Sequence, residues 1–374
     1  MPEMTFRERF VRTFHYQPVD RLPDMEFGYW DENYAIWHRQ GMPTSVCNET
    51  SAYNYFSVDP DDRWWLPGAI DMIPAFETEV LEETPTHKII RNSSGTICEI
   101  PKDGHSTIPR FIEFAVKNRA DFEKMKERYD PADPRRYPNP EGLARLREQY
   151  ARGNAIRGCW CNGFYGWARD WIGVENLSVL FYDDPDLIAD MFNWIADFVI
   201  EVHERGVQRL GIPDLKIDTT SFWEDMAFRG GPLISPAMFR KFQLPCYKRV
   251  TTWLRDRVGC DLNYVDCDGD ITALAGLFFE GGVNIMFPLE IGGGTDPYLL
   301  RKTYGKDMLF LGGVNKRELM KDHAAIDAEI ERIRPLIEDG GYIPHVDHRC
   351  PPDVSLDNYK YYRQQKQKLL GKIK

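Results

Sequence analysis

The sequence predicts an α/β protein of the (β/α)8 TIM-barrel class, and three observations support this prediction. After residue 153, short apolar runs alternate regularly with stretches that have the apolar periodicity of helices. Almost every apolar run leads to a small cluster of polar residues. The composition, with 43% hydrophobic and 28% charged residues among 374, is that of a globular chain long enough to bury one large core.

The apolar runs are expected to be strands and the stretches between them helices. The predicted strands are Ala155–Cys159, Leu215–Thr219, Leu262–Val265, Val283–Phe287, Met308–Leu311 and Tyr342–Val346, preceded by Arg21–Phe27. The predicted helices are Pro185–Arg205, Pro236–Arg257, Ile271–Glu280, Tyr298–Tyr304 and Ala324–Glu338. The first of them follows an acidic cap, Asp183-Asp184, and has a proline in its first turn. Strands that alternate with helices form βαβ units, and these runs, with one more that is not located, approach the eight strands of a barrel.

The region before residue 153 departs from this alternation. Between residues 60 and 115, alternating apolar and polar stretches surround Ser93-Ser94-Gly95, which is typical of a β-hairpin. Residues 117–150 are the most polar part of the chain and contain a proline-rich connection between two charged helical segments. We expect residues 60–150 to be a hairpin insertion near the N-terminal side of the barrel and a surface excursion, within one domain that spans residues 1–374.

The polar clusters distinguish a barrel from a doubly wound sheet, which is the competing fold. Five of the predicted strands lead to such clusters. The carboxyl ends of all the strands of a barrel meet at one mouth, where catalytic groups collect, whereas an open sheet has a single crevice at its switch point. Five polar strand ends therefore favour the barrel.

The charge of the chain makes two classes of partner unfavourable. The formal net charge is −11, and no long run of Lys or Arg occurs, so nucleic acids and anionic membranes are poor ligands. The first residues lack the apolar segment of a signal peptide, and no stretch is as long and apolar as a membrane helix, so we expect a cytoplasmic protein. The eight cysteines contain no CxxC pair and are expected to be reduced, mostly as small core residues, although Cys159 and Cys161 could place two thiols on one face of a strand end.

The densest group of reactive side chains is Asp266-Cys267-Asp268-Gly269-Asp270, directly after a predicted strand. Because side chains alternate along a strand, Asp266 and Asp268 should point the same way, into the barrel mouth. Two carboxylates so close together repel each other, so they need a cation, or one of them must hold a proton. The alternative is a solvated turn in which Asp270 caps the next helix, which explains Asp270 but not Asp266 at the end of a buried run.

The last predicted strand leads to a second reactive group, His345-Val346-Asp347-His348-Arg349-Cys350. An imidazole that joins two carboxylates forms a mixed oxygen and nitrogen site that suits Zn, Mn or Fe, and Asp347 could orient a histidine ring. The alternative for either histidine alone is a loop residue that donates to backbone carbonyls.

Other acids and aromatic side chains lie near further strand ends. The candidate catalytic acids are Glu224, Asp225 and Glu290. The candidate substrate-binding residues are Tyr29, Trp30, Trp223 and His345. Each has a structural alternative, since Glu290 could form a salt bridge and half of the aromatic rings after Arg21–Phe27 could belong to the core.

Several motifs together give the chain a resemblance to a known family. They are Phe6-Arg7-Glu8-Arg9-Phe10, Pro18-Val19-Asp20-Arg21-Leu22-Pro23, Gly230-Gly231-Pro232-Leu233-Ile234-Ser235-Pro236, Glu280-Gly281-Gly282-Val283-Asn284, Gly312-Gly313-Val314-Asn315, and Pro351-Pro352-Asp353 with Asn358. In this order and over nearly the whole chain, they resemble the uroporphyrinogen-decarboxylase superfamily. The resemblance implies a (β/α)8 barrel.

The superfamily has two well-known branches, and the resemblance is greater to the second. One branch decarboxylates uroporphyrinogen without a metal or cofactor. The other comprises corrinoid-linked methyltransferases, in which zinc is held by a His-x-Cys pair and a later Cys. On that pattern Asp266 stands in place of the His, Asp268 in place of the first Cys, and His348 in place of the later Cys, with His345 and Cys350 as alternatives.

This exchange of ligands predicts a change of chemistry. Carboxylates leave a metal harder and more Lewis-acidic than thiolates do, which favours polarising an ether oxygen. We therefore predict a methyltransferase-like enzyme that demethylates a methoxylated or similar small substrate and passes the methyl group to a corrinoid carried by a partner protein. A divalent metal, with Zn as the first choice, would be held by Asp266, Asp268 and His348, and Glu224 or Glu290 would protonate the leaving oxygen.

Two alternatives remain open. A decarboxylase of the uroporphyrinogen type needs arginines for a substrate with many carboxylates, and the resemblance assigns these to Met25–Asp31, which here contains acids and no Arg. A ligand-binding barrel without catalysis is compatible with the loss of the thiolate ligands, although the replacing residues can themselves bind metal. The resemblance implies a homodimer or a monomer.

Overall fold

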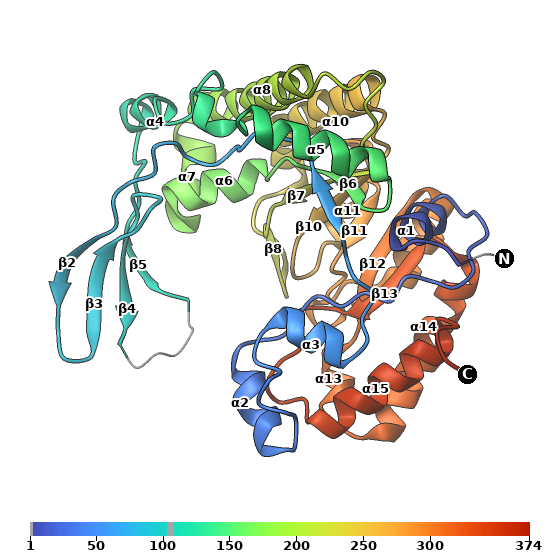
Figure 1. The fold of residues 1–374 in the computed structure, drawn as a ribbon. Helices are drawn as coiled ribbons and strands as arrows, with labels where there is room; N and C mark the ends of the chain where they lie inside the picture. Colours follow the sequence, from blue (N-terminus) through green and yellow to red (C-terminus); the bar gives the residue numbers. More distant parts are fainter. Residues whose placement is uncertain (1–2, 103–107) are drawn as a thin grey trace.

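The computed structural model describes residues 3–102 and 108–374, and within them the central sheet is parallel and has seven strands (Figure 1). The order of the strands is β1-β6-β7-β10-β11-β12-β13. Their bounds are β1 (Arg63–Trp65), β6 (Ile156–Trp160), β7 (Thr219–Trp223), β10 (Leu262–Asp266), β11 (Ile285–Phe287), β12 (Leu309–Val314) and β13 (Tyr342–Val346). The strands β11, β12 and β13 are buried along their whole length, as expected for parallel strands covered on both faces.

One predicted strand is displaced along the chain. The run Leu215–Thr219 overlaps β7 at a single residue, because the strand begins only at Thr219. The residues before it connect the preceding helix to the sheet, where the carboxylate of Asp218 accepts hydrogen bonds from the side chain of Arg7 and from the amide of Arg157. Glu224 and Asp225 therefore follow the strand end directly.

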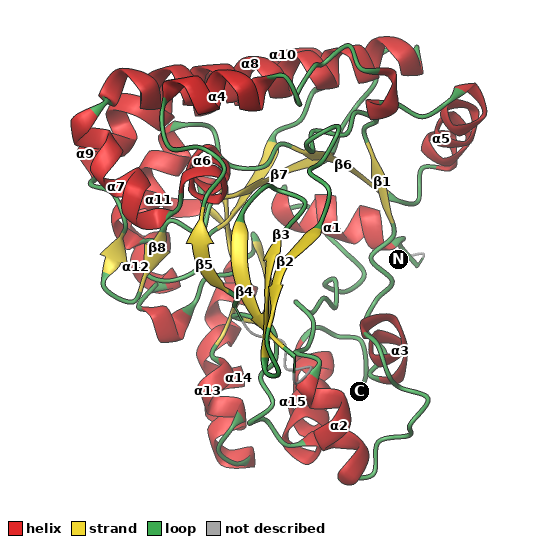
Figure 2. Cartoon of the chain, turned by 90° about the vertical axis from the view of Figure 1, so that its left-hand side faces the viewer, coloured by secondary structure: helices red, strands yellow, loops and turns green. Residues whose placement is uncertain are grey.

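Helices surround the sheet, and most of those predicted are present (Figures 1 and 2). Their bounds are α1 (Phe6–Phe14), α2 (Glu32–Arg39), α3 (Glu49–Tyr55), α4 (Arg119–Lys126), α5 (Pro140–Arg152), α6 (Phe164–Ile172), α7 (Val174–Asp183), α8 (Pro185–Leu210), α9 (Pro236–Met238), α10 (Leu244–Val258), α11 (Thr272–Glu280), α12 (Pro297–Tyr304), α13 (Lys316–Leu319), α14 (His323–Asp339) and α15 (Leu356–Leu369). The helix α8 begins as predicted, since the side chain of Asp184 accepts from the amide of Leu187 and Pro185 occupies the first turn. The predicted helix Pro236–Arg257 is divided into α9, a π-helical turn (Phe239–Gln243) and α10.

The helix α1 covers the amino ends of the strands. A cluster of buried apolar side chains joins this helix to the first residues of β6, β10, β11 and β12 and to Ile343 in β13. Its members are Phe6, Phe10, Phe14, Met25, Ile156, Leu262, Ile285, Phe287, Leu309, Leu311 and Ile343. Because this end of the sheet is filled, a site for a ligand is expected at the opposite, carboxyl ends of the strands.

The segment predicted as the first strand, Arg21–Phe27, is not one. None of these residues, all of which the structure describes, belongs to a regular strand, and a single parallel bridge joins Tyr29 to Cys350. The segment nevertheless bonds to residues beside both edge strands, since Asp59 donates its amide to the carbonyl of Asp24 and Cys350 donates its amide to the carbonyl of Gly28. The side chains of Asp24 and Glu26 bind Arg363 and Lys366 of α15. Ion pairs with this distant helix therefore hold the segment in place of the regular backbone hydrogen bonds of a strand. The described strands form a TIM-like parallel sheet, and a closed barrel stays a prediction.

A second, antiparallel sheet projects from the body of the molecule (cyan in Figure 1). In the part of the chain described, it has four strands, β2 (Glu79–Glu83), β3 (His87–Arg91), β4 (Ile97–Pro101) and β5 (Arg110–Glu113), in sequence order. The predicted hairpin corresponds to β3 and β4, which pair antiparallel around Gly95. A third, short pair consists of β8 (Ala227–Phe228) and β9 (Gly231–Pro232). Among the helices of the described residues, none has the length and apolar character needed to cross a membrane.

Candidate metal centre

Three aspartates lie together at the carboxyl ends of β7 and β10. Asp266 is the last residue of β10 and is paired in register with Trp223, the last residue of β7. Asp225 and Asp268 each lie two residues beyond these strand ends, and one carboxylate oxygen from each of the three aspartates lies within 4.8 Å of the other two. The structure thus brings Asp266 and Asp268 together, and the register of the two strands adds Asp225 to them. We call these three residues the aspartate cluster.

The charges of the aspartate cluster are unfavourable unless a cation is bound or a carboxylate holds a proton. Burial, together with the charges of Asp225 and Asp268, raises the pKa of Asp266 well above its ordinary range. Burial and the charge of Asp268 raise the pKa of Asp225 to about 6, although Arg169 acts in the opposite direction. The Oδ1 atom of Asp268 is buried and has no hydrogen-bond partner among the described residues. A buried oxygen without a partner and three mutually repelling carboxylates fit a bound divalent cation, which would satisfy both.

His348 is the histidine that reaches the aspartate cluster. Its Nε2 atom lies 3.2 Å from Oδ2 of Asp268. The ring of Trp30 stacks on the imidazole with centroids 5.9 Å apart, and the ring of Phe27 contacts it edge-on at 5.6 Å. These rings hold the imidazole beside Asp268, so the donor set available to a cation is carboxylate oxygen and one imidazole nitrogen.

The two alternatives to His348 lie elsewhere. His345 is buried, its Nδ1 atom lies 2.7 Å from the carbonyl of Val346, and burial lowers its pKa to about 4. Cys350 is also buried, beside Asn33 and Pro351, and burial raises the pKa of its thiol well above the ordinary value. His348 differs from both because its Nε2 atom lies 3.2 Å from a carboxylate oxygen of Asp268, although none of the three belongs to the group of close metal-binding atoms that the described residues form around Asp266.

Glu224, a predicted proton donor, is fully buried and already engaged. Its Oε1 atom accepts from the amide of Phe164 at 2.9 Å and from the hydroxyl of Tyr247, and its Oε2 atom accepts from the amide of Gly166 at 2.9 Å. The start of α6 approaches this closely because Gly163 has no side chain, since a Cβ atom there would lie 1.9 Å from the carbonyl oxygen of Trp223. Burial raises the pKa of Glu224 to about 7. These contacts make Glu224 an anchor for α6, and its backbone amide donates to the carbonyl of Asp266 in the aspartate cluster.

Glu290 and Asp347 also organise the backbone around the site. Glu290 accepts from Lys316 Nζ at 2.7 Å and from the amide of Gly269 at 2.9 Å, so the salt bridge considered for it is present and fixes the turn after Asp268. Asp347 accepts from the amides of Ile291 and Lys316. It therefore holds two loops rather than orienting a histidine ring as expected.

The aromatic candidates for substrate binding divide into two kinds. Tyr29 is fully buried among core rings and its hydroxyl lies 3.1 Å from that of Tyr359. Trp30, in contrast, is 39% exposed where it stacks on His348. Trp223 lies under the guanidinium of Arg169, 4.5 Å from the ring centroid, and the same guanidinium donates to the carbonyl of Asp225. Trp30 and Trp223 therefore flank the aspartate cluster, whereas Tyr29 belongs to the aromatic core around Trp37 and Tyr359.

Arg169 and Lys316 were missing from the sequence-based prediction of the site. Both lie on helices far along the chain from the residues they contact, and neither occurs in a motif that indicates metal binding. The surplus of acidic residues near the strand ends was the signal that could have predicted such residues, because buried acids require positively charged partners elsewhere in the chain.

Among the comparisons with known proteins, one solved structure supports the fold. A methyltransferase from Methanosarcina mazei has a similar structure, with a TM-score of 0.61, 13% sequence identity, and coverage of 98% of this chain and 99% of that chain. A B12-independent methionine synthase from Shewanella sp. W3-18-1 aligns with a TM-score of 0.33, 12% identity, and coverage of 62% of this chain and 66% of that chain, which is too low to support an argument. No curated protein matches the sequence. The model of the uroporphyrinogen decarboxylase (URO-D) family matches residues 95–367, more than half of the chain, and the chain therefore belongs to this family.

Proposed function

We propose that this protein is a metal-dependent methyltransferase that removes a methyl group from an oxygen atom of a small methoxylated substrate and transfers it to the corrinoid of a partner protein. The observation that carries the proposal is the aspartate cluster with His348 at the carboxyl ends of β7 and β10. Membership of the URO-D family and the fold shared with the methyltransferase from Methanosarcina mazei support the reaction class.

In this proposal, Asp266, Asp268 and His348 hold a divalent metal ion, with Zn²⁺ as the first choice. When bound, such an ion acts as a Lewis acid that polarises the oxygen from which the methyl group departs. Oxygen ligands make the ion harder than thiolates would, and this suits an oxygen-containing substrate. The buried Oδ1 atom of Asp268, which has no hydrogen-bond partner within the described ranges 3–102 and 108–374, is the part of the site that most requires a ligand.

We assign the protonation of the leaving oxygen to Asp225. Its carboxylate lies within 4.8 Å of both Asp266 and Asp268, so it borders the position of the substrate oxygen. Glu224 and Glu290, the two acids first considered for this step, are bound to backbone amides and to Tyr247 or Lys316. We propose that both are positioning residues, which hold α6 and the turn after Asp268.

The rings next to the metal ligands indicate the class of substrate. Trp30 exposes 39% of its surface and stacks on His348. A flat methoxylated aromatic compound could stack against this ring while its ether oxygen reaches the metal. We therefore expect methoxylated benzenes to be better substrates than methanol or other small aliphatic methyl donors.

Metal analysis of the purified protein tests the first part of the proposal. Wild-type protein should retain a metal that Asp266→Ala loses, because the substitution removes a ligand from the centre of the cluster. Asp261→Asn, which alters an exposed aspartate just before the same strand, is the matched control and should retain the metal. Metal content that is identical in wild type and Asp266→Ala would contradict this assignment.

An activity assay tests the second part. Free cob(I)alamin serves as acceptor, methoxylated benzenes as donors, and the absorbance spectrum of the corrinoid as readout. Transfer that depends on Asp266 and on added metal supports the proposal. Asp225→Asn should lower kcat more than KM, since it removes a proton donor and leaves the ring contacts of the substrate.

Decarboxylation of uroporphyrinogen is the activity for which the family is named, and the negative charge of the aspartate cluster disfavours it. A substrate with many carboxylates would approach three aspartates and would be repelled by them. Rapid turnover of uroporphyrinogen without metal would overturn the methyltransferase proposal in favour of this reaction.

A further inference from the structure

A second group of metal-binding side chains lies deep in the protein, between β6 and α8. Cys159 belongs to β6, Cys161 follows its last residue directly, and His203 belongs to α8. One atom from each of these three side chains lies within 4.8 Å of the other two, and all three residues are buried. The two sulfur atoms are 3.8 Å apart, because alternate residues of a strand point to the same side. We call these three residues the thiol cluster.

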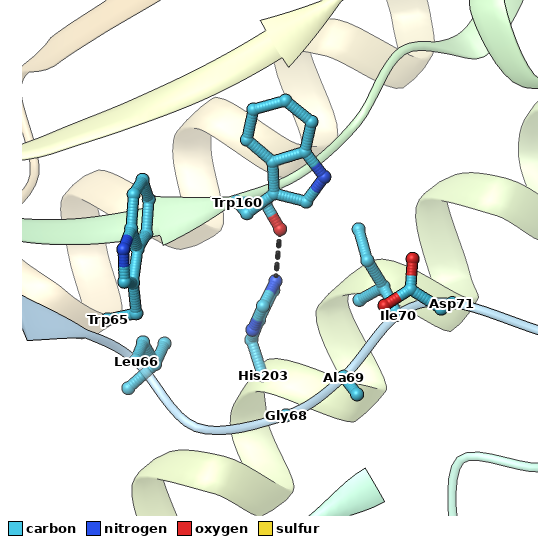
Figure 3. A pocket seen from close by; sticks show the side chains of 8 residues that line it. All are labelled: Trp65, Leu66, Gly68, Ala69, Ile70, Asp71, Trp160 and His203. Atoms are coloured by element: carbon cyan, nitrogen blue, oxygen red, sulfur yellow. Dashed lines mark hydrogen bonds between the residues drawn. The ribbon is translucent and has the colours of Figure 1, made fainter. Parts of the chain in front are cut away.

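The contacts of His203 favour a metal ligand over an ordinary core histidine. Its Nε2 atom lies 2.9 Å from the carbonyl oxygen of Trp160, as the dashed line in Figure 3 shows. A carbonyl oxygen can only accept, so Nε2 carries the hydrogen and Nδ1 presents a lone pair. Histidines that bind metals commonly donate their other ring N–H to a backbone carbonyl in this way.

The lone pair on Nδ1 of His203 accepts from no hydrogen-bond donor among the described residues, although the ring lies near the thiol of Cys161 and lowers its pKa. The Nδ1 atom is buried. A buried polar atom without a partner costs about 1–3 kcal/mol, so its retention calls for an explanation. A metal ion shared with the two sulfur atoms would provide one.

A cavity borders His203, one member of the thiol cluster. It has a volume of about 220 Å³ and is lined by His203, Trp160 and Trp65 and by the loop of residues 66–71 (Figure 3). The loop packs closely on α8 because Gly206 has no side chain, since a Cβ atom there would lie 1.9 Å from the carbonyl oxygen of Pro67. The cavity is large enough for several water molecules, one of which could complete the coordination of an ion.

We propose that Cys159, Cys161 and His203 form a binding site for a thiophilic divalent ion, Zn²⁺ above all, separate from the aspartate cluster. Two thiolates and a neutral imidazole balance the charge of a divalent ion, which is the condition for placing it in a buried site. Binding forms two metal–sulfur bonds and one metal–nitrogen bond and releases the two thiol protons to solvent. Thr220 supports the arrangement, since its hydroxyl contacts Sγ of Cys161 at 3.2 Å and donates to the carbonyl of Cys159 at 2.8 Å.

The ligand types separate the two sites chemically. The thiol cluster offers sulfur and nitrogen, whereas the aspartate cluster offers oxygen and one nitrogen. Sulfur ligands bind zinc at about 2.3 Å and oxygen or nitrogen ligands at about 2.0–2.2 Å, so X-ray absorption spectroscopy distinguishes the sites in one sample.

The decisive sample is full-length Asp266→Ala protein loaded with ZnCl2 and passed over a desalting column. The substitution weakens the aspartate cluster, so we expect one zinc ion per chain with two sulfur neighbours. Adding Cys161→Ser should abolish the sulfur signal and the retained zinc. The matched control is Cys246→Ser, which alters a buried cysteine of α10 outside the thiol cluster and should leave both unchanged.

His203→Gln gives a second test in case Cys161→Ser does not fold. It keeps a polar side chain of similar length and should weaken zinc binding at least tenfold in competition with a chelator, while the circular dichroism spectrum stays that of wild type. Zinc without sulfur neighbours in Asp266→Ala would overturn the proposal. So would the absence of bound zinc, or a Cys159–Cys161 disulfide in protein purified under reducing conditions.

The outcome is independent of the proposed methyltransferase activity. If the aspartate cluster binds no metal, wild-type protein should still show the zinc with sulfur neighbours. If the thiol cluster binds none, the metal of the aspartate cluster should show oxygen and nitrogen neighbours alone.

Discussion

Two groups of acidic side chains differ in how the protein compensates their charges. Asp24 and Glu26 are fully buried, and Arg363 and Lys366 of α15 bind both of them. The aspartate cluster faces the guanidinium of Arg169, 3.8 Å from Asp225, and the imidazole of His348, which is charged only when protonated. One group has its counter-charges built into the fold, and the other is short of them.

The pKa values follow this difference. Burial alone would raise the pKa of Glu26, but the charges of Lys366 and Arg363 outweigh it and hold this pKa below its usual value. Asp266 is half-buried, but its charged neighbours are Asp225 and Asp268, and its pKa is raised well above the usual range. Paired carboxylates contribute to the fold, whereas unpaired ones that are kept together indicate a bound cation.

The largest expected effect concerns Asp24 and Glu26, the group whose charges are paired with those of Arg363 and Lys366. Lys366→Met leaves Asp24 and Glu26 buried with a lost counter-charge, which should lower the free energy of unfolding by about 3–5 kcal/mol. Urea unfolding followed by circular dichroism measures the change. Lys368→Met, on the exposed side of the same helix, is the control and should change it by less than about 0.5 kcal/mol. Equal effects of the two substitutions would show that the buried pairs are not what stabilises this region.

A smaller effect concerns His345, which belongs to β13 and lies near Glu26. Burial lowers its pKa from 6.5 to about 4, so the folded protein favours the neutral ring. This contribution to stability is fully present above pH 6.5 and is lost as the pH falls through 4, and it amounts to about 3 kcal/mol. The difference in unfolding free energy between wild type and His345→Gln should therefore shrink as the pH is lowered from 7 to 4. A difference that does not depend on pH would contradict the buried, neutral histidine.

Metal binding to the aspartate cluster should stabilise the folded protein. At a free metal concentration of about one hundred times the Kd, the unfolding free energy should rise by about 2.7 kcal/mol for one site. Thermal unfolding of wild type with EDTA and with added Zn²⁺ measures the shift. In Asp266→Asn/Cys161→Ser, which alters both proposed sites, the shift should disappear.

The smallest predicted effect is a substitution that raises the unfolding free energy, whereas most substitutions lower it. In EDTA, Asp266→Asn removes one of three repelling carboxylates and should raise the unfolding free energy by about 1 kcal/mol. The corresponding change in the paired group, Asp24→Asn, should lower it, because Arg363 and Lys366 lose a partner. Urea unfolding in EDTA checks both signs. Destabilisation by Asp266→Asn would mean that the aspartate cluster is balanced by the protein itself.

Much of the candidate site follows from local patterns, and the rest depends on contacts between distant segments. Asp266 and Asp268 lie together because they are two residues apart at a strand end. The sequence left His348, His345 and Cys350 open as the third ligand, because all three lie within six residues. Their tertiary contacts differ, since His348 lies 3.2 Å from Asp268 and stacks on Trp30. His203 was missed, although a histidine on the buried face of the amphipathic helix α8 was a signal that could have been noticed.

The sequence by itself determined the alternation of strands and helices after residue 153, the family, and the pair of aspartates at the end of β10. These depend on periodicity and on short motifs, which act over a few residues. The tertiary structure decided that Asp225 joins the pair, that Glu224 is an anchor of α6, that Arg21–Phe27 is held by ion pairs rather than by a strand ladder, and that α8 brings His203 to Cys159 and Cys161. Each of these depends on strand register or helix packing, which places residues tens to hundreds of positions apart within a few ångströms and leaves no local pattern in the sequence.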